Sequence, residues 1–312
     1  MMAARDCTLL GRLPEVRGRI RAGAALDRVS WFRVGGPAEV LFTPADLEDL
    51  CGFLAAKPTD VPVTVLGVSS NVLIRDGGID GVVIRLGRAF AGIDTDGVDV
   101  AAGGSALDLN VARVACEAGI GGLEFLSGVP GTIGGAVRMN AGAHGREIGE
   151  VILSVGAIDE IGGVHTVAPD KLGFGYRRSA LPETWICTGA KLRGVVERAD
   201  IVARRMTDIA TAREASQPIR TRTGGSTFAN PAGDEKAWEL IDRAGCRGLA
   251  RGGAMVSEKH CNFLINNSTA TAADLEDLGE DVRRRVLETT GVRLEWEIRR
   301  LGRATPRPET DR

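Results

Sequence analysis

A short polar segment closes the β-rich stretch that begins at residue 61. Residues 66–71 read Leu-Gly-Val-Ser-Ser-Asn. Small residues at the end of a strand leave backbone N–H groups free, and two hydroxyls add donors, so the segment could bind an anion such as a phosphate. An ordinary Ser/Asn turn has the same composition. Taken alone, the segment leaves both interpretations open.

A second segment concentrates glycine. Residues 127–136 read Ser-Gly-Val-Pro-Gly-Thr-Ile-Gly-Gly-Ala, in which Gly131, Gly134 and Gly135 clear side chains from one face. A diphosphate would need this access, because main-chain N–H donors must come within about 3 Å of its oxygens. Residues 139–142, Met-Asn-Ala-Gly, would offer main-chain contacts to a flat ring. The alternative is a tight helix–sheet crossing, which also favours glycine.

Three further segments carry groups that could act on a substrate, although each is weak alone. They are residues 176–179 (Tyr-Arg-Arg-Ser), 223–231 (Thr-Gly-Gly-Ser-Thr-Phe-Ala-Asn-Pro) and 294–299 (Leu-Glu-Trp-Glu-Ile-Arg). A charged residue at the end of a strand is most often a solvated edge, which is the alternative for Glu297. An arginine, a hydroxyl and a carboxyl become informative only if the fold brings them together.

The elements that must position these groups alternate between strands and helices, which predicts an α+β or α/β chain. Ser105 is the expected cap of a helix that runs to Glu117. The dense glycine stretch 103–145 holds 11 glycines among apolar residues, so we expect it to be packed rather than a linker. We expect strands at 38–43, 61–67, 81–86, 98–103, 151–156, 185–191, 262–266 and 292–301, and helices at 45–56, 105–117, 201–215, 235–244 and 272–289.

Composition excludes several classes of protein. The 312 residues carry a net charge of −2, so we expect no nucleic-acid partner. The six cysteines lie far apart with no C-x-x-C pair, which predicts reduced thiols and no metal site. Neither a signal peptide nor a membrane span is predicted, so we expect no membrane partner and a cytoplasmic protein. Walker A, H-E-x-x-H, G-x-S-x-G and G-x-G-x-x-G motifs are absent from the sequence.

Taken together, seven motifs in one order closely resemble the UDP-N-acetylenolpyruvoylglucosamine reductases (UDP-N-acetylmuramate dehydrogenases), specifically their shorter subtype. The resemblance covers about residues 20–303. Another FAD-dependent oxidoreductase of the same fold is one alternative, and a non-enzymatic nucleotide-binding module is the other. The motifs occupy residues 33–38, 66–78, 127–145, 176–179, 224–231, 257–266 and 295–302.

The resemblance implies an α+β fold, with a two-subdomain FAD-binding module of the vanillyl-alcohol-oxidase type and a C-terminal α+β substrate domain. The best boundary in the second half is the Gln217-Pro218 pair. The implied domains are an N-terminal extension (1–19), FAD-binding subdomain 1 (20–88), FAD-binding subdomain 2 (89–216), the substrate-binding domain (217–303) and a disordered tail (304–312). By their composition, the last ten residues, 303–312, are expected to be disordered.

The resemblance also implies the cofactors FAD and NADPH, and the enolpyruvyl ether of UDP-N-acetylglucosamine as substrate. We expect a monomer. Two departures from the family pattern bear on binding: Ser69 stands where a glycine is usual, and Ala229 where a lysine is common. The implied FAD-binding residues are Gly67, Ser69, Ser70, Asn71, Ser127, Gly128, Gly131, Thr132, Gly134, Gly135, Asn140, Ala141 and Gly142.

Three implied catalytic residues are Arg177, Ser226 and Glu297. Hydride addition to the vinyl group leaves negative charge on the α-carbon and the carboxylate, and the family motif gives Arg177 the role of stabilising it. Ser226 would protonate the α-carbon, and Glu297 would act at the carboxylate with Arg177. The implied substrate-binding residues are Tyr176, Arg222 and Asn230.

Overall fold

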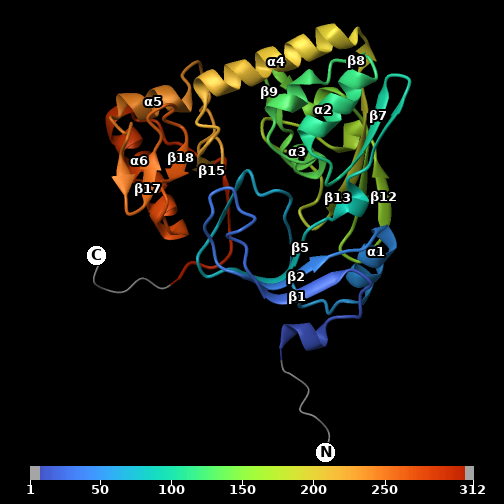
Figure 1. The fold of residues 1–312 in the computed structure, drawn as a ribbon. Helices are drawn as coiled ribbons and strands as arrows, with labels where there is room; N and C mark the ends of the chain where they lie inside the picture. Colours follow the sequence, from blue (N-terminus) through green and yellow to red (C-terminus); the bar gives the residue numbers. More distant parts are fainter. Residues whose placement is uncertain (1–7, 306–312) are drawn as a thin grey trace, which may run out of the picture. The chain divides into compact units, whose positions relative to one another are not determined.

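The computed structural model describes residues 8–305, which form two compact units built from interleaved stretches of chain (Figure 1). The first unit takes the described residues up to Ala22, then Val40–Gly67 and Gly81–Arg213. The second takes Gly23–Glu39, Val68–Asp80 and the residues from Glu214 onward. The contiguous domain ranges implied by the resemblance stay predictions. In the structure, residues 23–39 and 68–80 belong to the same unit as the C-terminal part of the chain.

The first unit begins with a four-stranded sheet of order β1-β2-β5-β3, in which β3 and β5 run parallel. Helix α1 (Leu47–Ala56) begins where the Asp46 side chain accepts a hydrogen bond from the Asp49 N–H, and it carries acids in its first turn. Its Phe53 joins Phe42 in the core beneath one face of the sheet. The strands are β1 (Arg19–Ala24), β2 (Ala38–Thr43), β3 (Val63–Val65) and β5 (Ile79–Ile84).

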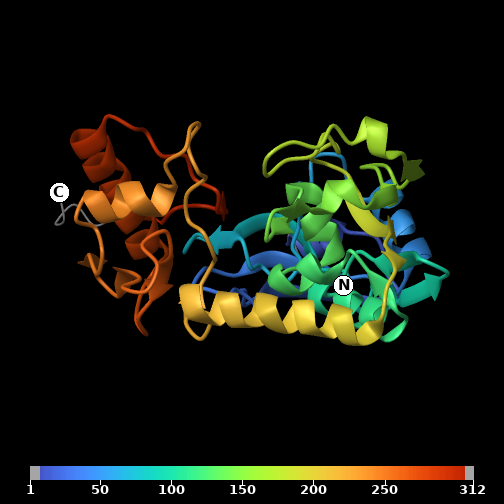
Figure 2. The same ribbon diagram turned by 90° about the horizontal axis from the view of Figure 1, so that it is seen from above.

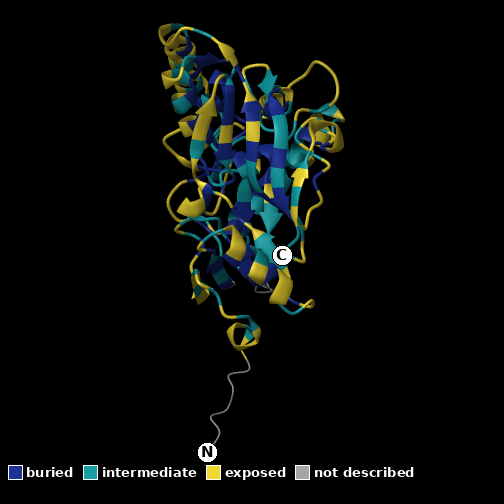
Figure 3. Cartoon of the chain, turned by 90° about the vertical axis from the view of Figure 1, so that its right-hand side faces the viewer, coloured by how far each residue is buried: buried dark blue, intermediate teal, exposed yellow. Residues whose placement is uncertain are grey.

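A five-stranded antiparallel sheet of order β12-β11-β13-β7-β6 forms the rest of the first unit. Figure 3 colours the residues of the chain by burial. Buried and exposed residues alternate over the last four residues of β13, as expected for a sheet with one covered face. Helices α2 (Asp108–Glu117) and α3 (Ile133–Met139) supply apolar residues to its core. The strands are β6 (Ile93–Asp96), β7 (Asp99–Gly103), β11 (Ile152–Ile158), β12 (Val164–Val167) and β13 (Ile186–Arg193).

Shorter elements complete the first unit, followed by the long helix α4 (Ala199–Ser216) that Figure 2 shows along its length. None of the helices within residues 8–305 is long and apolar enough to cross a membrane. The shorter elements are the two-stranded pairs β9 (Gly142–Ala143) with β10 (Arg146–Glu147) and β8 (Ile120–Gly121) with β14 (Val195–Val196), and the 3₁₀ turns η1 (Leu9–Arg12), η2 (Arg88–Phe90), η3 (Glu124–Gly128), η4 (Ile148–Glu150) and η5 (Pro169–Lys171).

The second unit packs α5 (Ala237–Arg243) and α6 (Ala272–Thr290) with the antiparallel sheet β15-β18-β17-β16. Helix α6 begins with a capping box between Thr271 and Asp274 and ends at Gly291, whose φ of 75° suits glycine. The strands are β15 (Arg222–Thr223), β16 (Ala250–Arg251), β17 (Ala254–Val256) and β18 (Leu264–Asn266), and a separate parallel pair joins β4 (Val72–Ile74) to β19 (Arg299–Leu301).

Three local expectations were wrong. Ser105 does not cap α2: its hydroxyl donates to the Gly87 carbonyl at 2.8 Å, and the helix begins after Leu107. The strand expected at 292–301 is confined to Arg299–Leu301, because residues before it make single contacts such as the Phe228–Trp296 bridge. Arg303, expected in an unstructured end, bonds its N–H to the Gly78 carbonyl. Most of the expected tail, residues 306–312, lies outside the described residues.

Candidate functional site

The two glycine-bearing segments predicted to bind phosphate meet within the first unit. Gly67 lies directly against Thr132, so a Cβ added at Gly67 would fall 2.9 Å from the threonine Oγ1. Thr132 immediately precedes α3, and its hydroxyl has no hydrogen-bond partner within residues 8–305. The end of β3 and the beginning of α3 therefore present a glycine and an available hydroxyl side by side.

The neighbouring glycines are required for different structural reasons. A Cβ at Gly131 would meet Asp108 Oδ2 at 2.8 Å, and one at Gly134 would meet the Gly104 carbonyl at 2.9 Å, so both are required by internal packing. Gly135 is exposed, and its nearest neighbour would be Thr132 Oγ1 at 3.8 Å. Glycine inside a helix costs about 1 kcal/mol relative to alanine, and nothing in the described chain requires it there. Approach of a ligand to the helix backbone would explain Gly135.

Asn140 ends α3 in the left-handed conformation, with φ of 43°, and is buried. Its side chain is committed to the protein: Nδ2 donates to Glu147 at 2.6 Å and to the Gly175 carbonyl at 3.1 Å, while Oδ1 accepts from the Gly149 N–H at 3.0 Å. Asn140 therefore joins the segment after α3 to the turn at Gly175. A contact of this residue with the cofactor would have to come from its main chain, and it stays a prediction.

Four other predicted cofactor contacts are also engaged within the protein. The Ser127 hydroxyl donates to the Glu124 carbonyl at 2.7 Å. The Ala141 N–H donates to the Ala136 carbonyl, and the Ala141 carbonyl accepts from the Ile148 N–H. The remaining predictions in this segment are Gly128, where a Cβ would meet that of Ala143 at 2.9 Å, and Gly142, which pairs with Glu147.

Arg177 lies at the tip of a tight turn. Gly175 and Arg178 exchange two main-chain hydrogen bonds of 3.1 Å, so Tyr176 and Arg177 are the central residues. Arg177 has φ of 55°, a conformation that L-residues other than Asn and Asp rarely adopt. Its guanidinium lies 5.3 Å from the centre of the exposed Tyr176 ring. The strain of about 1–2 kcal/mol at such a residue often accompanies function.

The two arginines of this motif are placed differently. The Arg178 side chain lies against Gly175, where an added Cβ would come 2.9 Å from its Nε. Arg177 is half-buried, whereas Arg178 is exposed. The turn thus distinguishes Arg177, the residue that the motif register selects, from its neighbour.

In the second unit, Ser69 takes the backbone conformation of the glycine it replaces. Its φ is 57°, and its hydroxyl is buried with no hydrogen-bond partner within residues 8–305. A buried hydroxyl without a partner is costly, so it indicates a group that the protein itself does not supply. Asn71, from the same loop, donates from Nδ2 to the Glu297 carbonyl at 3.1 Å.

The chain segments that carry Ser226 and Glu297 pair through their main chains in this unit. The Glu297 N–H donates to the Thr227 carbonyl at 2.9 Å, directly after Ser226, and Phe228 bridges to Trp296. Asn262 holds the serine segment by exchanging hydrogen bonds of 2.9 and 2.8 Å with the Phe228 main chain. Ser226 and Glu297 are both half-buried. The segments of Ser226 and Glu297 therefore lie side by side, and Asn71 contacts the main chain of the second one.

The predicted substrate-binding residues of this unit are less clearly placed. Arg222 is exposed and donates to the Ser268 carbonyl at 3.3 Å. Asn230 accepts a hydrogen bond from the Ala237 N–H at 3.0 Å, and so satisfies a donor in the first turn of α5. Their role at a diphosphate stays a prediction.

Two charged residues with buried polar atoms, Asp108 and Arg85, belong to none of the sequence motifs. Asp108 is fully buried in the first turn of α2, both carboxyl oxygens lack a partner within residues 8–305, and burial raises its pKa well above the usual range. Arg85 follows β5, and its Nε is buried without a partner there. The available signal was a charge inside an apolar pattern: the aspartate in the expected helix 105–117 and the arginine in the expected strand 81–86.

These features fit a flavin dinucleotide. FAD needs close approach of its diphosphate to main chain and hydroxyl donors. The first unit offers Gly67, Gly135 and Thr132 for this. The predicted Ser70 continues the same loop and is half-buried.

Comparison with known proteins agrees with this chemistry. Residues 38–168 match the family described as FAD binding domain, and residues 217–301 match the one described as UDP-N-acetylenolpyruvoylglucosamine reductase, C-terminal domain. A curated UDP-N-acetylenolpyruvoylglucosamine reductase from Rhodospirillum rubrum is 60% identical, over 97% of this chain and 96% of the relative. One from Paramagnetospirillum magneticum is 59% identical, over 97% and 98%.

A solved structure extends the comparison to the fold. The UDP-N-acetylenolpyruvylglucosamine reductase of Thermus caldophilus is 35% identical, with a TM-score of 0.80 over 92% of this chain and 100% of the other. These matches confirm the predicted fold class, an α+β chain with an FAD-binding module of the vanillyl-alcohol-oxidase type and a C-terminal α+β domain.

Proposed function

Since the chain belongs to the family of UDP-N-acetylenolpyruvoylglucosamine reductases, we propose that it reduces the enolpyruvyl ether of UDP-N-acetylglucosamine to UDP-N-acetylmuramate, with NADPH as electron donor. The product is a precursor of peptidoglycan. The observation that supports the proposal is the hydrogen bond from the Glu297 N–H to the Thr227 carbonyl, which pairs the segment of Glu297 with the one that carries Ser226. A module that only binds a nucleotide has no use for this pair.

When bound, FAD would supply the hydride chemistry between NADPH and the terminal carbon of the substrate's vinyl group. Gly67, Thr132 and Gly135 of the first unit would hold its diphosphate. The buried Ser69 hydroxyl is a further proposed contact with the cofactor. The remaining predicted contacts, including Gly128, Gly131 and Gly134, would then act by shaping the segment rather than by touching the cofactor.

Different residues of the protein have separate roles in the second half-reaction, the reduction of the substrate. As the new C–H bond forms, the vinyl π electrons move onto the α-carbon and the adjacent carboxylate. Arg177 stabilises that charge, because a guanidinium is a permanent cation with paired donors. Ser226 gives the proton of its hydroxyl to the α-carbon, which completes the lactyl ether. Glu297 orients the substrate carboxylate together with Arg177, and Tyr176, Arg222 and Asn230 bind the remainder of the substrate.

We further propose that the protein works as a monomer in the cytoplasm. The five described cysteines, Cys51, Cys116, Cys187, Cys246 and Cys261, are free thiols, as is usual in a reducing compartment. Sedimentation of the purified protein checks the oligomeric state.

An anaerobic spectrum of the flavin-loaded protein tests the activity. NADPH should bleach the absorbance near the flavin maximum, and the enolpyruvyl ether of UDP-N-acetylglucosamine should restore it. A protein that stays colourless with added FAD contradicts the proposal. So does a reduced protein that reacts with oxygen but not with this ether, because that behaviour belongs to an oxidase of the same fold.

A further inference from the structure

Arg85 lies beside the first residues of the flavin loop. Strands β3 and β5 run parallel, with Val65 opposite Ile84, and the Leu66 N–H donates to the Ile84 carbonyl at 2.9 Å. Parallel strands end at the same edge of a sheet, so Arg85 follows β5 where Leu66 and Gly67 follow β3. The same edge carries Gly67 against Thr132.

The alternation of side chains places Arg85 on a particular face of this sheet. Val82 and Ile84 belong to the apolar core that includes Phe53 of α1. Successive residues of a strand point to opposite faces, and the Arg85 N–H still pairs with the Phe42 carbonyl, as in a continuing strand. Arg85 therefore lies on the face opposite the core that α1 covers.

The charge of Arg85 has no counter-charge within residues 8–305. Its side chain makes no ion pair or hydrogen bond there, Nε is buried, and burial lowers its pKa. Arg75 shows the contrasting arrangement, because its guanidinium makes two bonds of 2.9 and 2.7 Å to Glu276. A guanidinium does not lose its proton in proteins, and a half-buried cation is costly without an anion. The described part of the chain therefore supplies no anion for Arg85.

We propose that Arg85 is the cation that neutralises the diphosphate of the bound flavin dinucleotide. The proposal rests on the proposed function, since it needs FAD. The diphosphate is the anionic part of FAD, and the edge that carries Arg85 also carries Gly67 and Thr132, which can admit and bind phosphate oxygens. Arg85 would thus supply charge where the main chain supplies access.

Arg85→Met removes the cation and keeps most of the side-chain volume, whereas Arg85→Lys keeps the charge without the planar donors. Titration of the FAD-free proteins with FAD, followed by quenching of flavin fluorescence, should show about 10- to 100-fold weaker binding for Arg85→Met. Arg85→Lys should lose less than Arg85→Met. Arg113→Met, a charge loss at an exposed position of α2, is the control and should bind FAD within about twofold of the parent protein.

A second readout separates binding from a structural role. Thermal unfolding without FAD should give Arg85→Met a midpoint equal to or above that of the parent, while the rise in midpoint caused by FAD should shrink. A lower midpoint without FAD, or FAD binding equal to the parent, overturns the proposal. If Arg85→Met does not fold, Arg85→Gln is measured in the same way. A parent protein that binds no FAD overturns the proposed function and this inference together. If the parent binds FAD and Arg85→Met binds it equally well, only this inference is overturned.

Discussion

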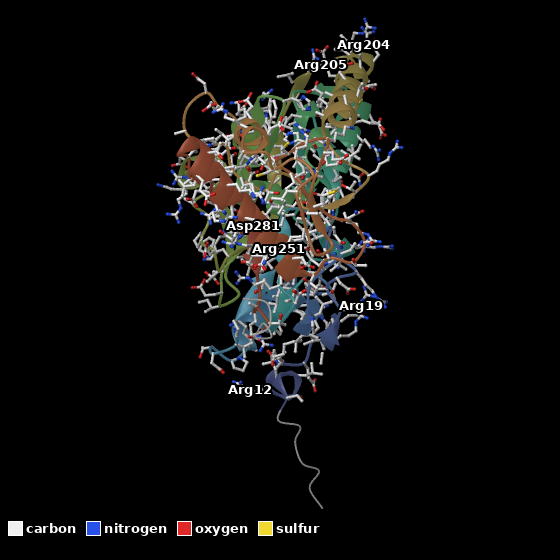
Figure 4. All side chains as sticks on the ribbon, turned by 90° about the vertical axis from the view of Figure 1, so that its left-hand side faces the viewer. Arg12, Arg19, Arg204, Arg205, Arg251 and Asp281 are labelled. Atoms are coloured by element: carbon white, nitrogen blue, oxygen red, sulfur yellow. The ribbon has the colours of Figure 1, made fainter. Side chains whose placement is uncertain are left out.

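Two regions of the molecule treat buried charge in opposite ways. Along α6 in the second unit, Glu276 binds both Arg75 and Arg300, and Glu280 accepts from the Trp296 indole at 2.8 Å. In the first unit, Asp108 is buried and Arg85 is half-buried, and both have buried atoms that lack partners within residues 8–305. Arg251 and Asp281, both labelled in Figure 4, form another ion pair of α6, with 2.9 Å between nitrogen and oxygen.

The difference separates scaffold from binding site. Charges that are paired internally position a helix and need nothing from outside. Charges that stay unpaired are tolerated where a ligand completes them, or where the group becomes neutral, as burial favours for Asp108. Four substitutions test whether residues of the binding site and residues of the scaffold respond differently, from the largest expected effect to the smallest.

Ser226→Ala should give the largest effect, a loss of about 10²- to 10⁴-fold in the reoxidation of reduced flavin by substrate. Reduction of the flavin by NADPH should stay within about twofold, because the serine acts only as a proton donor to the α-carbon. Stopped-flow absorbance measures both half-reactions. An equal loss in both would remove the proton-donor role.

Arg177→Ala should slow reoxidation by about 10²- to 10³-fold, because a charge-stabilising donor is lost. Arg178→Ala is the matched control from the same turn and should cost less than about tenfold. Glu297→Ala should follow Arg177→Ala in direction. If Arg178→Ala were the more damaging, the motif register that selects Arg177 would be wrong.

Glu276→Gln should lower the free energy of unfolding by about 2 kcal/mol at pH 7, because Arg75 and Arg300 lose a shared carboxylate in a partly buried place. The hydrogen bonds from these arginines, that of Arg75 foremost, hold the pKa of Glu276 below its usual range. The carboxylate's contribution is therefore full above about pH 4.3 and is lost as pH falls through the lowered pKa. Urea unfolding at pH 7 and pH 3 should show the difference between the two proteins shrink, with FAD affinity unchanged at pH 7.

Asp108→Asn should raise the free energy of unfolding at pH 8 by about 1 kcal/mol, because the amide removes the cost of keeping a buried carboxyl neutral. The raised pKa means that this cost is absent below about pH 3.9, the unfolded value, and grows as pH rises toward the folded value. The exposed Asp94→Asn serves as control in the same urea titrations. A stability difference that does not change with pH would mean that Asp108 ionises freely in the folded protein.

Local patterns predicted the elements where one physical signal dominates. Strand β2 was expected at 38–43 and occupies Ala38–Thr43, because its apolar residues alternate. The strand expected at 292–301 shortens to Arg299–Leu301, since its pairing partner β4 lies more than 200 residues earlier and the local pattern does not contain that register. Pairing with a distant strand therefore determines how much of an alternating segment forms a strand.

The site was predictable in its motifs but not in its buried charges. The resemblance supplied Arg177, Ser226 and Glu297, and the strained turn and the Thr227 pairing support those assignments. Arg85 could not be singled out, because 34 of the 39 basic residues are arginine and one more carries little information. Asp108 could not be either, since burial depends on the packing of Gly131 against it.

The interleaving of the two units sets an order of events during synthesis. Strand β4 (Val72–Ile74) finds its parallel partner only in β19 (Arg299–Leu301), and Phe32 and Leu73 belong to the core of α5 and α6. A ribosome releases the N-terminal segments first, so these residues must wait, with apolar surface uncovered, until almost the whole chain has emerged. Premature termination anywhere before β19 therefore leaves the second unit incomplete, and such nascent chains should be targets for chaperones and proteases.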